Sequence, residues 1–341
     1  MLNKKTSNQF SDVLDHVKRT SNQVNCSGTA TLVIHNNSIV LEEYTGKQSK
    51  KPDARKVQSD TQFHVASVRK SYIGFAVAYA VYHGYIKSID DLVVNYLPEL
   101  EKDIWDGTTI RHLLTHTHGL NVKRNSTYRE FPAGTSWSYK QVGIDALTTL
   151  VKRVTNKTVA DILHEKVFLP LQFSQSGWYA KKHEKLVDVI LRYDGDKDWY
   201  ESESTAGDKM NMYVSARELA MWGYMHLLEG NLKGKQIVEK EIIHMATSIQ
   251  SPQCLDKDLP QNGFLWFVKE LPAKKTEIGE RVPVGSFQIL GYTGVTLLVI
   301  PEESLVAVRM FNSFGSPDGF DYLSDVRSFG DTVVSCLEKV K

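Results

Sequence analysis

The sequence predicts an α+β fold in which one antiparallel sheet, flanked by an N-terminal and a C-terminal helix, is split along the chain by an inserted all-helical lobe. Three observations support this: strand-like apolar runs lie near both ends of the 341 residues, amphipathic helical patterns begin and end the chain, and helical patterns fill its middle. We therefore assign residues 1–60 and 250–341 to a discontinuous sheet domain and residues 61–249 to a mainly helical lobe. The active site is expected in the seam between them.

The N-terminal part is predicted to be a helix followed by a hairpin. Apolar residues recur at helical spacing from Phe10 to Val17, which predicts a helix over about 7–19. Segments 29–35 and 38–44 are rich in strand-forming residues. The pair Asn36-Asn37 between them tolerates positive φ, as a tight hairpin turn requires.

The middle of the chain reads as helical and the C-terminal part returns to strands. Segment 71–85 is apolar and rich in small residues, which suits a buried helix, and Thr108 or Thr109 can cap a helix that ends at Leu114. Further helices are predicted at about 142–155, 159–167, 215–228 and 239–248. The C-terminal pattern predicts strands at 286–291, 295–300 and 305–311 and a helix at about 322–337.

Composition excludes several classes of function. Lys and Arg number 41 against 40 for Asp and Glu, so electrostatics gives no reason to expect nucleic acid as a partner. The longest apolar runs, such as 295–300, are far shorter than the ~20 residues of a membrane span. Three scattered cysteines indicate free thiols. No apolar segment follows Lys4 and Lys5, so a cytoplasmic protein is expected if the chain starts at its natural beginning.

Ser67 and Lys70 form the pattern Ser-x-x-Lys at the start of the buried helical segment. Residues three apart share a helix face, so the lysine can reach the serine hydroxyl. A lysine whose pKa is lowered by burial can take the serine proton and make the hydroxyl a nucleophile. The N–H groups of a helix N-terminus would favour a developing oxyanion there. The pattern by itself is weak, and its position and neighbouring motifs strengthen it.

The other polar motifs favour structural roles. His116 and His118 could be half of a metal site, but no third ligand has suitable spacing. Segment 230–236 is similar to a phosphate-binding loop, yet it is one residue short and Gln236 replaces the hydroxyl residue. The sequence therefore predicts neither a metal nor a cofactor.

Three ordered stretches then accompany Ser67 and Lys70: residues 90–99 (DDLVVNYLPE), 110–120 (IRHLLTHTHGL) and 132–141 (PAGTSWSYKQ). With these motifs the chain resembles the serine β-lactamase/penicillin-binding-protein superfamily, in its class C β-lactamase-like branch of DD-peptidase-like enzymes and carboxylesterases. The resemblance covers roughly 29–312. It implies the β-lactamase/DD-peptidase-like fold, no cofactor, and a small ester, amide or peptide-like substrate.

The resemblance also assigns roles. Ser67 matches the nucleophile, Lys70 the paired base and Tyr139 the tyrosine of the YxN motif, a phenolate that an adjacent ammonium can hold well below its free pKa of about 10. The backbone N–H groups of Ser67 and Val295 would form the oxyanion hole.

Departures from the family pattern concern substrate binding. His118 replaces a usual serine, Gln141 replaces the asparagine two places after Tyr139, and Tyr292 replaces the usual Lys or His before Thr293 and Gly294. By the resemblance, Gln141, Tyr292, Thr293 and Gly294 contact substrate. The missing cation weakens the case for substrates with a carboxylate, such as β-lactams and D-Ala-D-Ala peptides.

The leading hypothesis is a serine hydrolase that forms an acyl-enzyme on esters or amides. One alternative is a catalytically idle binding module, which the changes at Gln141 and Tyr292 motivate. The other is a true β-lactamase or D-Ala-D-Ala peptidase. The joint presence of Ser67, Lys70 and Tyr139 favours an enzyme.

Overall fold

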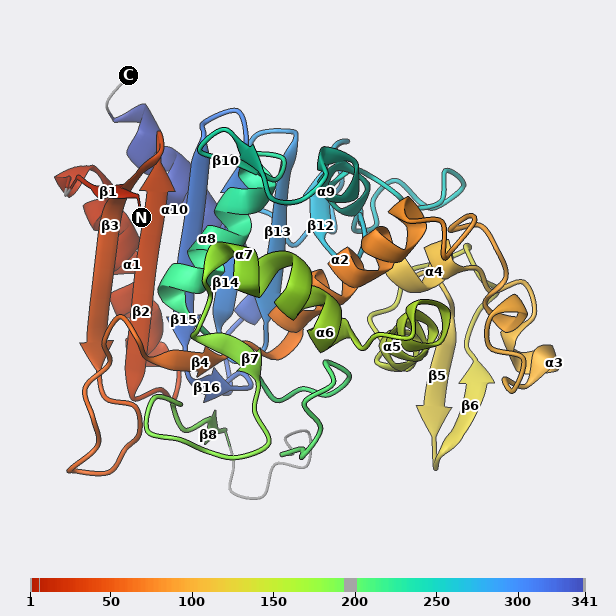
Figure 1. Ribbon diagram of the computed structural model, residues 1–341. Helices are drawn as coiled ribbons and strands as arrows, with labels where there is room; N and C mark the ends of the chain where they lie inside the picture. The colour runs from red at the N-terminus through yellow and green to blue at the C-terminus, as the bar shows by residue number, and fades with distance from the viewer. Residues whose placement is uncertain (1, 6, 193–200, 340–341) are drawn as a thin grey trace.

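A seven-stranded sheet is the largest element of the computed structural model, which describes residues 2–5, 7–192 and 201–339 (Figure 1). Its strand order is β1-β3-β2-β15-β14-β13-β12, and every pairing is antiparallel except that of β1 with β3. Strands from both ends of the chain therefore share one sheet, as predicted. The strands are β1 (Asn3–Lys4), β2 (Gly28–His35), β3 (Ser38–Gly46), β12 (Phe267–Lys269), β13 (Ser286–Gly291), β14 (Val295–Ile300) and β15 (Leu305–Phe311).

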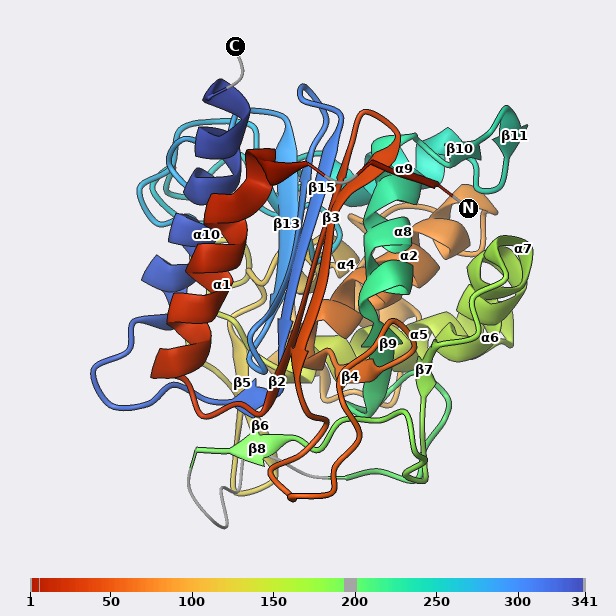
Figure 2. The same cartoon turned by 90° about the vertical axis from the view of Figure 1, so that its left-hand side faces the viewer.

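Helices cover both faces of this sheet. Figure 2 shows α1 (Ser11–Gln23) and α10 (Tyr322–Glu338) side by side on one face and α8 (Ala216–Leu227), with α2 (Arg69–Tyr82) beyond it, on the other. The alternation of side chains along a strand explains why the central strands are apolar throughout. In β14, Leu297 and Val299 join the core under α8, whereas Leu298 and Ile300 join the core under α1 and α10.

The block between the two groups of strands is not purely helical, which corrects the predicted all-helical lobe. It contains a small sheet of β4 (Gln62–His64), β9 (Met212–Ser215) and β7 (Ser176–Trp178). It also contains a hairpin of β5 (Leu120–Lys123) and β6 (Ser126–Arg129). Strands of three or four residues are too short to produce a readable alternation. In addition α8, which lies within residues 61–249, packs on the large sheet.

The helices of this block are close to their predicted bounds. Those that were predicted are α4 (Ile110–Leu114), α5 (Val142–Thr155), α6 (Val159–Leu163) and α9 (Lys240–Thr247). The short helices α3 (Lys102–Trp105) and α7 (Leu169–Leu171) were not predicted. Thr109, not Thr108, caps α4, and a π-helical turn continues α6 over His164–Phe168. The remaining short strands are β8 (Ile190–Leu191), β10 (Asn231–Leu232), β11 (Lys235–Gln236) and β16 (Ser313–Phe314). No helix among the described residues is long and apolar enough to cross a membrane.

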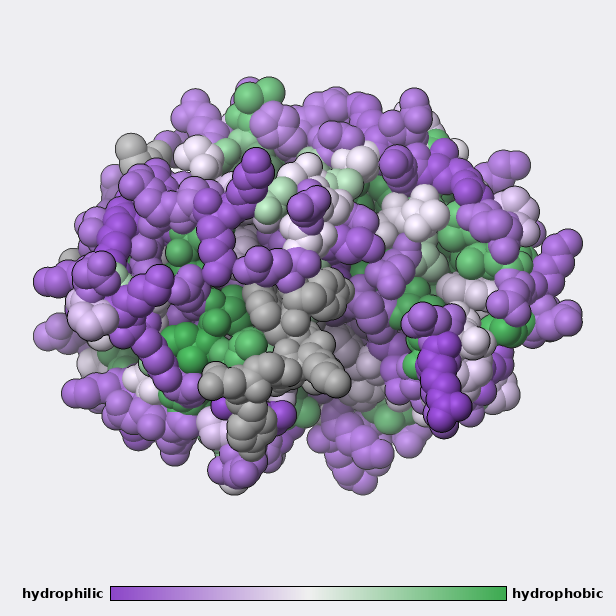
Figure 3. Space-filling model, turned by 90° about the horizontal axis from the view of Figure 1, so that it is seen from below, coloured by the Kyte–Doolittle hydropathy of each residue, from purple (hydrophilic) through white to green (hydrophobic). Residues whose placement is uncertain are grey.

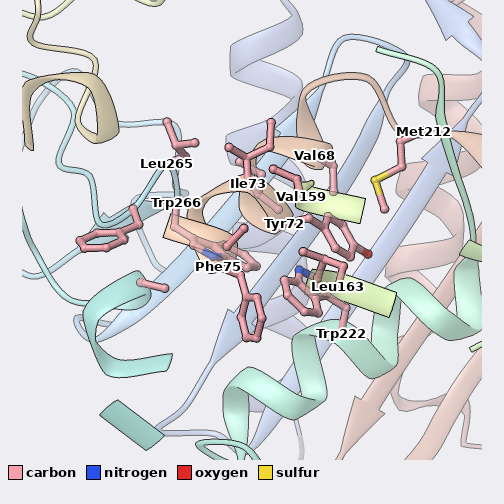
Figure 4. Packing of buried hydrophobic residues seen from close by; sticks show 14 of the residues in the cluster. Val68, Tyr72, Ile73, Phe75, Val159, Leu163, Met212, Trp222, Leu265 and Trp266 are labelled. Carbon is pink, nitrogen blue, oxygen red and sulfur yellow. The ribbon is translucent and has the colours of Figure 1, made fainter. Parts of the chain in front are cut away.

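Helix α2 is enclosed by apolar side chains, which fixes the position of its N-terminus (Figure 4). The ring of Tyr72 stacks on Trp222 of α8 at a centroid distance of 4.3 Å, and the Trp222 indole N–H donates to Ser71 Oγ at 3.1 Å. At Gly74 a β-carbon would lie 2.1 Å from the carbonyl oxygen of Phe264, so glycine permits the close approach of the neighbouring loop. Packing from several directions therefore holds α2 in one place.

A buried ion pair joins the sheet to the terminal helices. Arg309 of β15 is 1% exposed, and its Nη2 lies 2.6 Å from Oδ2 of Asp325 on α10. Thr20 of α1 donates to the other Asp325 oxygen at 2.6 Å. Burial, followed by the charge of Arg309, lowers the pKa of neighbouring His16 to about 4, so this histidine is neutral near pH 7. One carboxylate thus connects three elements that are far apart in sequence.

Replacement of Arg309 should destabilise the protein strongly. Arg309→Met leaves Asp325 buried without its cation, a change that typically costs about 3–5 kcal/mol. The free energy of unfolding measured by urea denaturation should fall by that order. Arg153→Met is the control, because Arg153 pairs with Glu99 on the surface and its loss should change stability little. Equal, small effects of the two substitutions would contradict this role of Arg309.

Candidate active site

A short, strained turn presents Ser67 at the N-terminal end of α2. Val65 N–H donates to the Met212 carbonyl at 3.1 Å, and Ala66 N–H donates to His64 Nδ1 at 3.2 Å. Ala66 has φ of +46°, a left-handed conformation that non-glycine residues adopt at a cost and that often occurs at functional sites. Ser67 then lies in a 3₁₀ turn (Ala66–Val68) that continues into α2. Its N–H is in the first turn, where helix donors lack an internal acceptor.

Ser67 and Lys70 are in direct contact, as their spacing predicts. Lys70 Nζ lies 2.8 Å from Ser67 Oγ, and the lysine is only 4% exposed. Burial, assisted by the charge of Arg69, lowers the pKa of Lys70 well below that of a free lysine, while Asp145 opposes the shift. A lowered pKa increases the fraction of neutral amine, and the neutral amine can accept the serine proton.

Tyr139 meets the same pair from the segment that precedes α5. Lys70 Nζ lies 4.5 Å from the centroid of the Tyr139 ring. Burial raises the pKa of Tyr139 to about 12, against smaller opposing effects of a hydrogen bond with Ser67 and the charge of Arg69. This direction favours the phenol over the phenolate that was expected from the sequence. The same desolvation lowers the pKa of the neighbouring Lys70, which weakens its action as an ammonium on Tyr139. The role of Tyr139 in catalysis stays a prediction.

The two histidines of the 110–120 stretch support the tyrosine segment. His116 is 1% exposed, its ring lies 4.6 Å from that of Tyr139, and its carbonyl accepts from Ser138 N–H at 2.9 Å. His118 is fully buried, and its Nδ1 accepts from Leu120 N–H at 3.0 Å. The His116 ring therefore packs against Tyr139 without a hydrogen bond to another described residue, and the His118 ring both packs and accepts a hydrogen bond, which agrees with the structural role that the sequence favours.

The end of β13 comes unusually close to the turn that holds Ser67. A β-carbon at Gly291 would lie 2.2 Å from the carbonyl oxygen of Val65, so a larger residue would separate the two segments. Tyr322 of α10 donates to the Gly291 carbonyl at 2.9 Å. The edge strand β12 pairs with residues 286–288 of β13 and extends no further. The last part of β13 is therefore an open edge beside the serine.

The predicted motif at residues 292–295 is divided between the pocket beside Ser67, which Tyr292 lines, and the protein interior. Tyr292 lines the pocket beside Ser67 and is 39% exposed. Thr293 is fully buried, and its hydroxyl donates to the His64 carbonyl at 2.7 Å, so it joins two backbone segments. Gly294 forms the turn with φ of +86°, and Val295 is buried in β14 opposite Gly291. Thr293, Gly294 and Val295 are absent from the described pocket lining.

Gln141 lines the pocket, at the position where the family usually has asparagine. Its Oε1 accepts from Arg69 Nη2 at 3.3 Å, and its Nε2 donates to Asp145 Oδ1 at 3.0 Å. Both ends of the amide thus have partners, which fixes its orientation at the entrance of α5.

The pocket has a volume of about 690 Å³ and mostly apolar walls. Among the described residues that line it, Lys70 is the one basic side chain and Glu277 the one carboxylate. Much of the wall is made of residues that were not predicted from the sequence, namely Trp137, Phe267, Glu277, Leu290, Phe314 and Tyr322. Trp137 lies in a recognised motif and could have been included, but the others come together through the fold.

From below, the molecule is mostly hydrophilic, with hydrophobic side chains gathered left of centre (Figure 3).

Comparison with known proteins gives relatives along almost the whole chain. An uncharacterized protein of Alkalihalophilus pseudofirmus is 59% identical over 336 residues, covering 98% of this chain and 99% of its own. Esterase EstB of Burkholderia gladioli is 26% identical over 206 residues, which cover 50% of this chain and 51% of EstB. The crystal structure of a penicillin-binding protein homologue from Caulobacter crescentus superimposes with a TM-score of 0.77 at 16% identity, covering 98% and 100% of the two chains.

The family comparison agrees with the fold. The model of the Beta-lactamase family matches residues 13–328. This range includes Ser67, Lys70 and Tyr139, as well as the sheet and helices that surround them. The chain therefore belongs to the Beta-lactamase family, whose fold is a mixed α/β structure with a mostly antiparallel central sheet.

Proposed function

We propose that this protein is a serine hydrolase that cleaves esters or amides through an acyl-enzyme. The observation that carries the proposal is the contact of 2.8 Å between Ser67 Oγ and the amine of buried Lys70, beside Tyr139 in an apolar pocket. A surface Ser-x-x-Lys pair would have a hydrated, protonated lysine that could not act as a base. Burial of Lys70 is therefore what distinguishes this Ser-x-x-Lys pair from one on a protein surface.

The proposed acylation begins when neutral Lys70 takes the proton of Ser67 Oγ as this oxygen bonds to the substrate carbonyl carbon. The carbonyl oxygen becomes an oxyanion, for which the N–H groups of Ser67 and Tyr292 are the proposed donors. Tyr292 replaces Val295 in this role because it lines the pocket and its N–H makes no hydrogen bond to another described residue. Preorganised backbone donors of this kind lower the barrier substantially.

Tyr139 is the proposed acid for the leaving group. It enters the reaction protonated, gives its proton to the departing oxygen or nitrogen as the tetrahedral intermediate collapses, and regains a proton from Lys70. Water then attacks the carbonyl carbon of the acyl-enzyme with neutral Lys70 as base, and Lys70 passes the proton to Ser67 Oγ as its bond to the acyl carbon breaks, which releases the acid and restores Ser67. The atoms balance as hydrolysis, with one water consumed for each ester or amide bond broken.

The pocket favours substrates without a carboxylate. Lys70 is the one basic side chain in its described lining, and its pKa is lowered, so no permanent cation is available to pair with an anion. This argues for esters or simple amides over β-lactams and D-Ala-D-Ala peptides. An idle binding module remains the alternative from another class, but such a module has no need of a buried amine in contact with a serine hydroxyl.

Ser67→Ala should abolish covalent labelling and turnover. Intact-mass spectrometry of the wild type with a p-nitrophenyl ester should show one added acyl group, and the alanine variant should show none. Ser138→Ala, one residue before Tyr139, is the matched control and should still form the adduct. A cephalosporin and a D-amino-acid amide in the same panel test the substrate preference. An unmodified wild type with no turnover of any acyl donor would eliminate the hydrolase and leave the binding module.

The pH dependence of acylation should report the burial of Lys70. Protonated Lys70 cannot act as base, so the rate should rise with pH through a midpoint well below 10.5. Because the pKa of Tyr139 is raised to about 12, its loss of a proton should not reduce the rate near pH 10. Stopped-flow measurement of the acylation rate against pH checks both the rise assigned to Lys70 and the absence of a fall near pH 10. A rising limb centred near the value of free lysine would contradict the proposed base.

Substitution of the lysine provides the complementary measurement. Lys70→Ala should lower the acylation rate by roughly 10²–10⁴, the usual contribution of a general base. Lys140→Ala is the matched control, since Lys140 pairs with Glu130 at 3.2 Å away from the pocket lining, and it should acylate at the wild-type rate. Full activity of Lys70→Ala would mean that another group deprotonates Ser67.

A further inference from the structure

Glu277 is a buried carboxylate in the wall of the pocket that the proposed reaction does not use. It belongs to the loop between β12 and β13 and is only 8% exposed. Its Oε2 is buried and has no hydrogen-bond partner among the described residues. The backbone around it is fixed, because Gln288 donates to the Glu277 carbonyl at 2.6 Å and Arg327 donates to the Thr276 carbonyl at 3.3 Å. The loop is therefore anchored while the carboxylate is left unsatisfied.

An unpaired buried carboxylate is unfavourable by itself. Water no longer solvates it well, and no described ion pair within 4 Å compensates the loss. Burial raises the pKa of Glu277, and the charge of Arg327 offsets this in part. A cationic group brought by a ligand would supply the missing partner and would favour the ionised carboxylate. The position of Glu277 in the pocket lining makes such an encounter possible.

The walls beside Glu277 are aromatic, which also favours a cation. The ring of Tyr292 lies 5.4 Å from that of Phe314 and 5.5 Å from that of Tyr322, and Trp137 lies 6.4 Å from Phe267. The faces of such rings attract ammonium groups, and sites for quaternary ammonium combine several of them. Glu277 lines the same pocket as Ser67, Lys70 and Tyr139, so a ligand in this pocket can reach the carboxylate and the proposed reacting groups together.

We propose that Glu277 and the surrounding aromatic side chains bind a cationic nitrogen of the substrate, so that the preferred ester or amide carries an ammonium group. This inference rests on the proposed function and specifies its substrate class. The family usually has a cation where Tyr292 stands, suited to a substrate carboxylate. In this chain Tyr292 places an aromatic ring at that position, and the pocket wall holds the carboxylate of Glu277. The pocket would therefore select a positively charged substrate group and not a negatively charged one.

Two pairs of isosteric esters test the proposal on the full-length protein. The p-nitrophenyl ester of 4-(trimethylammonio)butyrate is compared with that of 5,5-dimethylhexanoate, which replaces the charged nitrogen by carbon in the acyl group. Acetylthiocholine is compared with S-(3,3-dimethylbutyl) thioacetate, which makes the same change in the leaving group. The wild type should prefer the cationic member of at least one pair by about 10- to 100-fold in kcat/KM, as expected for an interaction with a charged partner.

Glu277→Gln keeps the size of the side chain and removes its charge. The preference for the cationic ester should fall about tenfold or more, while hydrolysis of the neutral ester stays near the wild-type rate and shows that the variant is folded. Glu280→Gln is the matched control, because Glu280 is an exposed carboxylate of the same loop and does not line the pocket. It should keep the full preference.

Binding of tetramethylammonium, followed by saturation-transfer NMR, provides a readout that does not need turnover. The ion should bind the wild type and Ser67→Ala, and binding should weaken about tenfold or more in Glu277→Gln. If no ester is hydrolysed but this binding pattern holds, the hydrolase proposal fails and the cation site stands. Equal kcat/KM for both members of each pair, with tetramethylammonium binding unaffected by Glu277→Gln, would overturn the inference while leaving the hydrolase intact.

Discussion

The contact between the backbone of the Ser67 turn and the end of β13 is the constraint on which the arrangement depends. Gly291 allows β13 to approach the Val65 carbonyl more closely than any side chain would permit. The Thr293 hydroxyl reinforces the contact by donating to His64, at the start of the same turn. Through these two links the large sheet and the block that carries α2 meet at Ser67, the proposed nucleophile. The strained backbone at Ala66 is tolerated because hydrogen bonds and packing fix its surroundings.

Burial then determines the chemistry available at that contact. The same desolvation that lowers the pKa of Lys70 raises the pKa values of Tyr139 and Glu277, because it disfavours whichever form is charged. For Lys70 and Tyr139 this shift favours the uncharged forms that the proposed base and the proposed acid require. Enzymes commonly use a low-dielectric pocket to bring such groups into working range.

Membership of the Beta-lactamase family fixes less about substrate than about fold. Gln141 and Tyr292, the two positions expected to depart from the family pattern in substrate binding, both line the pocket. The Gln141 amide is held by Arg69 and Asp145, so the longer side chain is accommodated by its neighbours. Tyr292 contributes an aromatic ring to a wall that includes a carboxylate. Such changes can redirect specificity without touching Ser67, Lys70 or Tyr139.

The sequence by itself determined the long elements and the reactive pair. The strands 286–291, 295–300 and 305–311 and the contact of Ser67 with Lys70 follow from local periodicity, which depends on neighbours along the chain. Tertiary structure decided the rest. It placed Tyr292 on the pocket and Val295 in the interior, raised the pKa of Tyr139 and buried Glu277 in the pocket wall. These outcomes depend on desolvation and on close approach between segments far apart in sequence, neither of which a local pattern encodes.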